Sequence, residues 1–187
     1  MDFASYAEQY LKETGDIAVK INRQDIVKTA EILSALKTKG GRLFILGVGG
    51  SAANASHAVN DFRKIAGIET YAPTDNAAEL TARTNDEGWH TTFSKWLETS
   101  KLGANDALLI LSVGGGSQTT SLNIKEAIDL AIQRKAKITA IVSRDGGYAK
   151  QKADACVLVP VVCDERITPH AEGWQGVVWH LIVNAIK

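Results

Sequence analysis

Five short apolar runs alternate with longer amphipathic segments from about residue 40 onward. The runs start near Arg42, Ile68, Ala107, Lys137 and Ala155. Strands that are almost continuously apolar are typical of a parallel sheet covered on both faces, and the segments between them are long enough for crossover helices. The pattern predicts an α/β fold with three layers, in which about five parallel strands form a doubly wound sheet.

The first 39 residues follow the period of a helix instead. Ile26, Ala30 and Leu33 recur at the spacing of one helix face, and we expect Gly15 to break or kink this helical segment. We therefore predict a single domain over residues 1–187, made of an N-terminal helical extension at 1–39 and an α/β core at 40–187. A further helix is expected from about Gly173 to the C-terminus.

Composition excludes several classes of protein. The chain has 187 residues, 45% of them hydrophobic, and its 21 Lys and Arg balance 21 Asp and Glu, which argues against nucleic acid as a partner. No apolar run approaches the roughly 20 residues needed to cross a membrane, and the charged N-terminal segment lacks the apolar stretch of a secretory signal. We expect a soluble cytoplasmic protein without a membrane partner. Cys156 and Cys163 lack the spacing of a zinc or redox motif, so we expect core or loop thiols.

Glycine and hydroxyl side chains gather where three of the predicted strands end. Residues 47–51 (GVGGS) follow the first strand and enter a helix, residues 112–121 (SVGGGSQTTS) follow the third, and RDGG follows Ser143. Helix N-termini offer N–H groups and a favourable dipole to an anion, and the carboxyl ends of parallel strands meet at one edge of a sheet. The two longer loops favour one phosphate monoester, although ordinary Gly/Ser turns remain the alternative.

The first loop also fits a dinucleotide-binding pattern, with Gly47, Gly49 and Ala52 at the required spacing and Glu69 about 20 residues further on. Two features count against a dinucleotide. Glu69 stands near the start of the second predicted strand and not at its end. The second hydroxyl-rich loop, at residues 112–121, also lies at a strand end, so two loops could bind one phosphate.

Ionisable side chains are concentrated in two short segments. His57 and Asp61 are four residues apart, so they project from one face of the predicted helix. Near the C-terminus stand His170, Glu172 and His180. A His and a carboxylate at this spacing can bind a metal ion, share a proton or form a structural pair. His90 and His170 are expected to be polar loop residues.

Taken together, these motifs resemble those of the sugar isomerase (SIS) domain family and, within it, the phosphoheptose isomerases. The resemblance extends over GVGGSAANASHAVNDF, the pair Asn85-Asp86, residues 112–121, which we call the Ser/Gly loop, IVSRDGG and HAEGWQGVVWHLI. It implies a flavodoxin-like SIS fold and a homotetramer with sites at subunit interfaces. The chain departs from the family at Val48, where Asn is common, at Asp61 in place of Glu, at Glu172 in place of Gln, and in its longer Ser/Gly loop.

The resemblance also implies an activity, the conversion of D-sedoheptulose 7-phosphate into D-glycero-D-manno-heptose 7-phosphate, which supplies heptose for bacterial surface glycans such as lipopolysaccharide. Asp61, aided by Glu172, would act as the base and His180 as its acid/base partner. Zinc would be held by His57, Asp61, Glu172 and His180. The residues expected to contact the substrate are Gly49, Gly50, Ser51, Asn54, Asp86, Ser112, Ser117, Thr119 and Ser121.

Helix geometry restricts the zinc site. Eight helical residues rise about 12 Å, whereas zinc ligands lie within roughly 2.3 Å of one ion. Glu172 and His180 can both bind only if Glu172 lies on the approach to the helix, as the neighbouring Pro169 and Gly173 suggest. Two other functions stay open: isomerisation of a different sugar phosphate, and a non-enzymatic SIS module that senses a phosphosugar or assembles with a partner. The long N-terminal helix favours a homo-oligomer.

Overall fold

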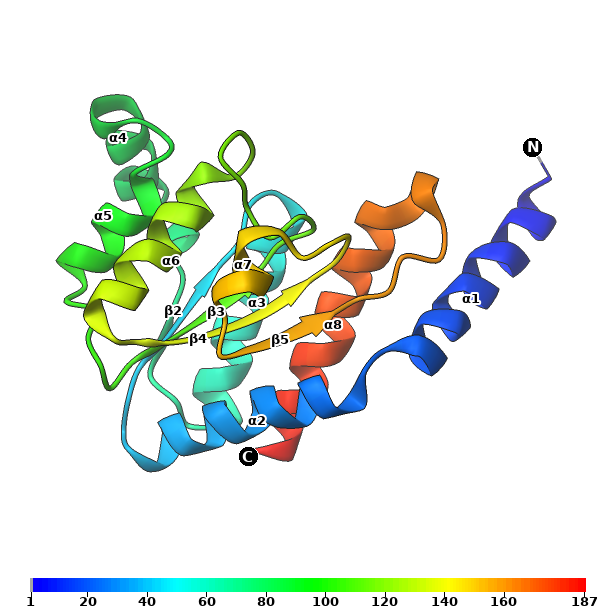
Figure 1. Ribbon diagram of the computed structural model, residues 1–187, viewed down its shortest axis with the longest axis horizontal. Coiled ribbons are helices and arrows are strands. Elements are labelled where there is room, and N and C mark those ends of the chain that lie inside the picture. The colour runs from blue at the N-terminus through cyan, green and yellow to red at the C-terminus, as the bar shows by residue number, and fades with distance from the viewer. Residues whose placement is uncertain (1) are drawn as a thin grey trace.

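A parallel β-sheet forms the centre of the molecule. The computed structural model describes residues 2–187, and within them the sheet has five strands in the order β2-β1-β3-β4-β5 (Figure 1). Every neighbouring pair is parallel. The strands are β1 (Leu43–Leu46), β2 (Thr70–Tyr71), β3 (Ala107–Leu111), β4 (Lys137–Val142) and β5 (Ala155–Leu158). Each predicted apolar run contains one strand, so the predicted fold class is confirmed.

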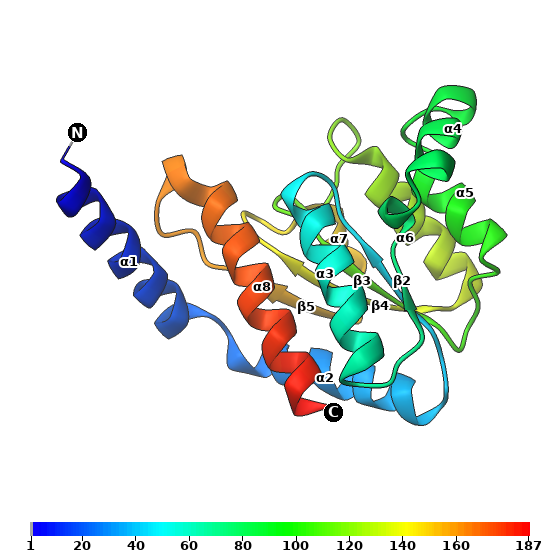
Figure 2. The same cartoon turned by 180° about the vertical axis from the view of Figure 1, so that it is seen from behind.

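Helices cover both faces of the sheet, which gives three layers (Figure 2). The bounds are α1 (Phe3–Lys20), α2 (Arg23–Thr38), α3 (Gly50–Lys64), α4 (Ala77–Glu87), α5 (Thr92–Thr99), α6 (Leu122–Arg134), α7 (Gly147–Lys152) and α8 (Ile167–Ala185). Short 3-10 turns occupy Pro73–Asp75 and Asp164–Arg166. Helices α2, α3 and α8 pack on one face, and α5, α6 and α7 pack on the other.

Strand β1 shows why the apolar runs are continuous. Successive side chains of a strand point to opposite faces, so Leu43 and Ile45 belong to the cluster under α2, α3 and α8. Phe44 and Leu46 belong to the cluster under α5 and α6. Because both faces are covered by helices, both sets are apolar.

The N-terminal extension consists of two helices that meet at Ile21, and α1 projects away from the body of the molecule (Figure 1). The expected break at Gly15 is wrong, because α1 continues through this residue. A glycine costs an exposed helix only about 1 kcal/mol, whereas Asn22 supplies a true start signal by accepting a hydrogen bond from the Gln24 N–H at 2.9 Å.

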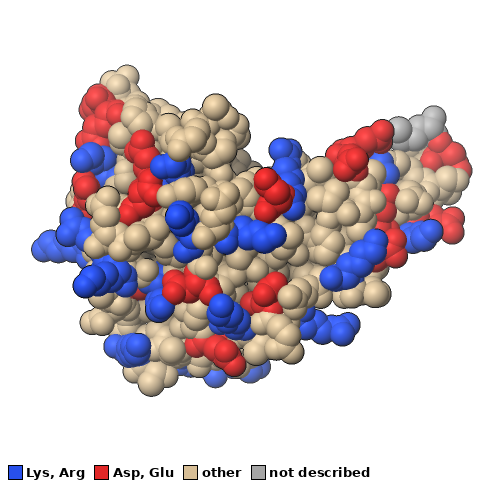
Figure 3. All heavy atoms as spheres, in the orientation of Figure 1, with Lys and Arg blue, Asp and Glu red and all other residues tan. Residues whose placement is uncertain are grey.

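The C-terminal helix α8 begins at Ile167, earlier than the expected Gly173. Pro169 stands in the first turn of α8, where a missing N–H removes no intrahelical bond, so it does not interrupt the helix. Among residues 2–187, every helix is too short or too polar to cross a bilayer. Lys, Arg, Asp and Glu are interspersed over the face shown in Figure 3.

Candidate active site

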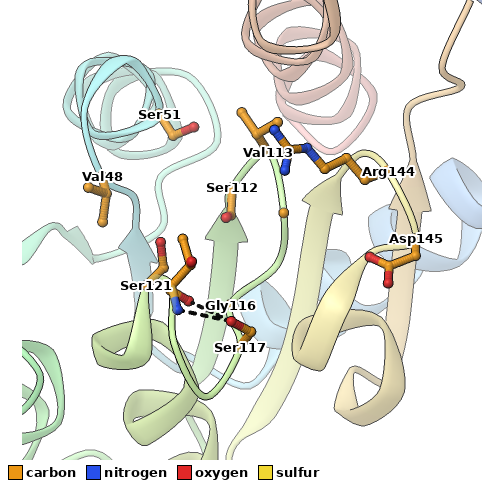
Figure 4. A pocket seen from close by; sticks show the side chains of 11 residues that line it. Val48, Ser51, Ser112, Val113, Gly116, Ser117, Ser121, Arg144 and Asp145 are labelled. Carbon is orange, nitrogen blue, oxygen red and sulfur yellow. Dashed lines mark hydrogen bonds between the residues drawn. The ribbon is translucent and has the colours of Figure 1, made fainter. Parts of the chain in front are cut away.

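A cavity of about 340 Å³ lies at the carboxyl ends of the central strands (Figure 4). It sits beside the point where the strand order reverses between β1 and β3, the position at which open α/β sheets bind ligands. The lining residues are Val48, Ser51, Ser112, Val113, Gly114, Gly116, Ser117, Thr120, Ser121, Arg144 and Asp145. Four of the expected substrate residues, Ser51, Ser112, Ser117 and Ser121, therefore line one pocket.

The loop between β3 and α6 is organised by its own hydroxyls. The Ser112 hydroxyl accepts a hydrogen bond from the Gly115 N–H at 3.0 Å, and the Ser117 hydroxyl accepts one from the Thr120 N–H at 2.9 Å. Ser121 precedes α6 with a left-handed backbone, φ 51°. The loop thus ends with several hydroxyls at the N-terminus of a helix, where an anion is favoured.

The loop between β4 and α7, together with the first turn of α7, packs against the Ser/Gly loop and supports it. The N–H groups of Tyr148 and Ala149, in the first turn of α7, donate to the carbonyls of Gly116 and Gly115 at 3.0 and 2.9 Å. A β-carbon on Gly115 would overlap the Gly146 carbonyl oxygen, so the backbones approach too closely for any other residue. The Gly115 carbonyl and the Gly116 N–H belong to the same trans peptide and point in opposite directions. Because that carbonyl points toward α7, the Gly116 N–H points away from α7.

A carboxylate of the protein itself lies against the loop between β1 and α3. Gly49 has φ 63°, and Gly50 begins α3. The Glu172 carboxylate lies against Gly50, where a β-carbon would overlap it. A carboxylate at the N-terminus of α3 is stabilised by the helix dipole. Glu172 therefore occupies the anion-favouring end of α3, next to the pocket residue Ser51.

Helices α3 and α8 run side by side (Figure 2). Their packing brings three ionisable residues together. The Asp61 Oδ2 atom lies 3.9 Å from the His57 Nε2 and 3.7 Å from the His180 Nε2. One ligand atom from each of the three lies within 4.8 Å of the others. The Asp61 side chain is only 13% exposed. We call His57, Asp61 and His180 the trio.

The orientation of His180 is fixed from two sides. Its Nδ1 lies 2.7 Å from the Gly176 carbonyl oxygen, which can only accept, so Nδ1 carries a hydrogen, and in the neutral imidazole the lone pair is on Nε2. The Trp179 ring stacks on His180 with centroids 3.5 Å apart, and it also meets His57 edge to face at 4.8 Å. The buried indole thus supports both imidazoles of the trio.

The trio fits a divalent metal ion. Two imidazole nitrogens and one carboxylate oxygen form the donor set of zinc sites with an open fourth position. Ligands about 2.1 Å from one ion in tetrahedral geometry lie about 3.4 Å apart, close to the two distances around Asp61. The bond from Nδ1–H of His180 to a carbonyl is the outer contact that metal-bound histidines commonly make.

Glu172 lies outside this trio, contrary to the expected geometry. It stands in the second turn of α8, and His180 follows eight residues later on the same regular helix, which corresponds to a rise of about 12 Å. The expectation that Glu172 precedes the helix is wrong, because α8 starts at Ile167. Within one chain, Glu172 belongs to the pocket end of α8 and His180 to the trio.

Other expected residues also lie outside the lining of the pocket. Asn54 donates to the Glu172 carbonyl at 2.9 Å and to Gln175 at 3.2 Å, so it ties α3 to α8. Asp86 is exposed on α4 and accepts a hydrogen bond from Asn85. Thr119 is exposed at the tip of the Ser/Gly loop.

Arg144 and Asp145 line the pocket but were not among the expected site residues. The RDGG cluster at the end of the fourth strand was the signal that could have found them. His170 was expected in a loop, which is wrong: it is buried in the first turn of α8 and contacts Glu13. Cys156 and Cys163 are free thiols, as expected, and burial raises the pKa of Cys156 to about 11.

Comparison with known proteins agrees with this architecture. Residues 6–151 match the model of the SIS domain. The chain belongs to the SIS domain family. A phosphoheptose isomerase of Thermodesulfovibrio yellowstonii is 33% identical over 87% of this chain and 79% of its own length. The lincomycin biosynthesis protein LmbN of Streptomyces lincolnensis is 28% identical over 95% of this chain and 67% of its own length.

A solved structure supports the same placement. The phosphoheptose isomerase of Neisseria gonorrhoeae superposes with a TM-score of 0.83 at 26% identity, and the match covers 98% of this chain and 95% of that one. The resemblance to phosphoheptose isomerases is thereby confirmed. The expectation of an enzyme is confirmed as well, because both of these phosphoheptose isomerases, which align over most of the chain, are isomerases by name.

Proposed function

We propose that this SIS domain protein is an aldose–ketose isomerase that converts D-sedoheptulose 7-phosphate into D-glycero-D-manno-heptose 7-phosphate. The observation that carries the proposal is the pair of Asp61 and His180, a carboxylate and an imidazole 3.7 Å apart. Isomerisation requires one group that removes a proton next to the carbonyl and another that moves a proton between oxygens. The names of the relatives support this reaction.

The phosphate belongs on the loop between β3 and α6. Ser117, Thr120 and Ser121 offer hydroxyls there, and the N-terminus of α6 favours an anion. The N-terminus of α3 is less suitable, because the Glu172 carboxylate already lies against Gly50 and would repel a phosphate. A substrate held this way extends its sugar toward α3.

The trio of the same chain is too far along α3 to reach this sugar. Ser51 lines the pocket and Asp61 follows ten residues later on the helix, a rise of about 15 Å. The five C–C bonds from C2 to C7 of a heptose, each about 1.5 Å long, span at most about 8 Å. We therefore place the substrate between two copies, with the pocket from one copy and the trio from another.

Exposed apolar side chains on α8, beside the trio, and on α1 support such an interface. Val177 and Leu181 flank His180 on one face of α8 and are 50% and 49% exposed. On α1, Phe3 and Leu11 are also largely exposed. Apolar surface of this kind next to functional groups is typical of a protein–protein interface. Together with the family resemblance, it favours a homotetramer.

Each residue of the composite site then has a chemical role. Asp61 removes the proton from the carbon next to the carbonyl and returns it to the neighbouring carbon after a cis-enediol has formed. His180 accepts and donates protons through Nε2, because Nδ1 is committed to the Gly176 carbonyl. Asp61 is shorter than the Glu common in the family, and Glu172 beside the pocket provides a second carboxylate that aids it.

Zinc is the cofactor that best fits the trio. Bound by His57, Asp61 and His180, it would polarise the carbonyl and hydroxyl oxygens of the substrate. The Nε2 lone pair of His180 serves either the metal or a proton at one time. Glu172 of the same chain is two turns away, so only the Glu172 of a second copy could act as a fourth protein ligand.

One observation favours a second candidate, the isomerisation of another sugar phosphate. Val48 lines the pocket and presents an apolar side chain where the family commonly has Asn. The loss of an amide removes a hydrogen-bonding group that could read a sugar hydroxyl. The relative from Streptomyces lincolnensis, which aligns over most of the chain, is named for lincomycin biosynthesis.

An NMR assay tests the proposed function. Purified protein is incubated with sedoheptulose 7-phosphate, and the anomeric signals of the aldose are followed, with a panel of five- to seven-carbon sugar phosphates in parallel. The expected result is a new aldose signal from sedoheptulose 7-phosphate. Turnover of another member only would support the second candidate, and binding without turnover of any member would identify a phosphosugar-sensing module.

A further inference from the structure

Arg144 is the one positively charged side chain that lines the pocket. It follows β4, and its side chain extends from the β4–α7 loop toward Val113 (Figure 4). Within residues 2–187 its guanidinium makes neither an ion pair nor a hydrogen bond. The neighbouring Asp145 is already engaged, since its Oδ1 accepts a hydrogen bond from the Gly147 N–H at 3.0 Å.

The backbone of Arg144 is held in an unfavourable conformation. Its φ is 54°, in the left-handed region that residues with a β-carbon rarely adopt. Four residues other than glycine have such a φ, among residues 2–187: Lys101, Ser121, Lys135 and Arg144. Lys101 lies one residue beyond the C-cap of α5 and Lys135 is the C-cap of α6, and this conformation commonly stops a helix at such positions.

The remaining two, Ser121 and Arg144, line the same pocket. Strained backbone that does not serve to end a helix is concentrated at functional sites. The surrounding structure holds Arg144 in place: the Ser143 N–H donates to the Val113 carbonyl at 2.9 Å, and the Ser143 hydroxyl donates to Val159 at 2.9 Å. These bonds fix the backbone from which the Arg144 side chain leaves, beside the Ser/Gly loop.

We infer that Arg144 binds the phosphoryl group of the substrate, beside the hydroxyls of Ser117, Thr120 and Ser121. This inference rests on the proposed function, which makes the ligand a phosphate monoester. A phosphate carries close to two negative charges, whereas the hydroxyls and amides of the loop are neutral. A guanidinium offers a planar pair of N–H donors that matches two phosphoryl oxygens. Arg144 thus supplies the positive charge that the other residues lining the pocket lack.

The inference is tested by phosphate affinity, measured by calorimetry with inorganic phosphate and with sedoheptulose 7-phosphate. Arg144→Gln should raise both dissociation constants about 10-fold or more, because a charge-assisted hydrogen bond is lost. Arg144→Lys should recover part of the loss, since it keeps the charge but not the two-pronged donor. Arg134→Gln, an exposed arginine on α6, is the matched control and should bind as the wild type does.

Two results would overturn the role of Arg144: wild-type phosphate affinity in Arg144→Gln, or no measurable binding of inorganic phosphate by the wild-type protein. Turnover is scored separately. If the protein binds phosphate through Arg144 but isomerises no sugar phosphate, the inference holds and the proposed function fails. If it isomerises sedoheptulose 7-phosphate and Arg144→Gln keeps the wild-type KM, the proposed function holds and the inference fails.

Discussion

Asp61 on α3 and His180 on α8 face each other across the helix interface, with Oδ2 3.7 Å from Nε2. The contact joins the first helix of the α/β core to the last helix of the chain. It depends on side-by-side packing of these helices, which Asn54 stabilises by donating to α8. The pair combines a nearly buried carboxylate with the imidazole nitrogen that is not bonded to the Gly176 carbonyl, which is an arrangement suited to proton transfer.

His180→Asn tests the acid/base role. Asn can still donate to the Gly176 carbonyl, but it lacks the Nε2 atom, so turnover should fall about 10²- to 10⁴-fold while the fold is kept. Steady-state rates and circular dichroism measure the two effects. His90→Asn, in an exposed loop, should keep the wild-type rate. Retention of more than a tenth of the activity in His180→Asn would remove His180 from the mechanism.

Mixing two inactive variants tests whether the site is shared between copies. Ser121→Asp adds a negative charge to the pocket and should prevent phosphate binding, whereas His180→Asn disables the trio. If the site is composite, mixed oligomers contain some sites with an intact pocket and an intact trio. Activity should therefore reappear after the two variants are unfolded and refolded together. Persistent inactivity of the mixture, with mixed oligomers verified by mass spectrometry, would show that each site belongs to one chain.

Metal content tests the trio as a zinc site. The purified protein is expected to bind about one zinc ion per chain, measured by elemental analysis after dialysis against zinc. His57→Asn should lose most of this metal, because a two-ligand site binds zinc weakly, and His90→Asn should keep it. Treatment with a chelator should lower turnover at least about 10-fold, and added zinc should restore it. An unchanged rate after complete metal removal would eliminate zinc but leave the isomerase intact.

Glu13 gives the structure a predictable response to acid. This carboxylate is only 3% exposed and accepts hydrogen bonds from Arg166 at 2.9 and 2.7 Å and from His170 at 2.8 Å. The Arg166 hydrogen bonds, followed by those of His170 and Gln9, hold the pKa of Glu13 well below its ordinary value of 4.5. Because the folded pKa is lowered, its contribution is complete above the ordinary value and is lost as the pH falls below it.

Replacing Glu13 with Gln should therefore lower the urea midpoint at neutral pH, and the difference from wild type should shrink as the pH falls below about 4.5. Urea titrations at several pH values measure both trends. Glu8→Gln removes an exposed carboxylate from the same helix and should change the midpoint little. A difference between Glu13→Gln and wild type that does not vary with pH would contradict the assigned ion pair.

Local pattern was a good guide to the strands and the Ser/Gly loop. Each strand is an apolar run flanked by polar residues, and this composition follows from burial on both faces. The local sequence pattern was a poor guide to helix ends. Gly15 and Pro169 are both compatible with a helix in their actual positions, the first within a long exposed helix and the second in a first turn.

The sequence by itself determined the five-stranded α/β fold, the hydroxyl-rich loop at the end of β3 and the pairing of His57 with Asp61, because these depend on residues close together in the chain. Only the tertiary structure decided that His180 joins this pair while Glu172 faces Gly50, that Glu13 meets Arg166 and His170, and that Arg144 lies over the pocket. Contacts of this kind depend on how helices and loops from distant parts of the chain pack on the sheet, and neither spacing nor composition encodes that geometry.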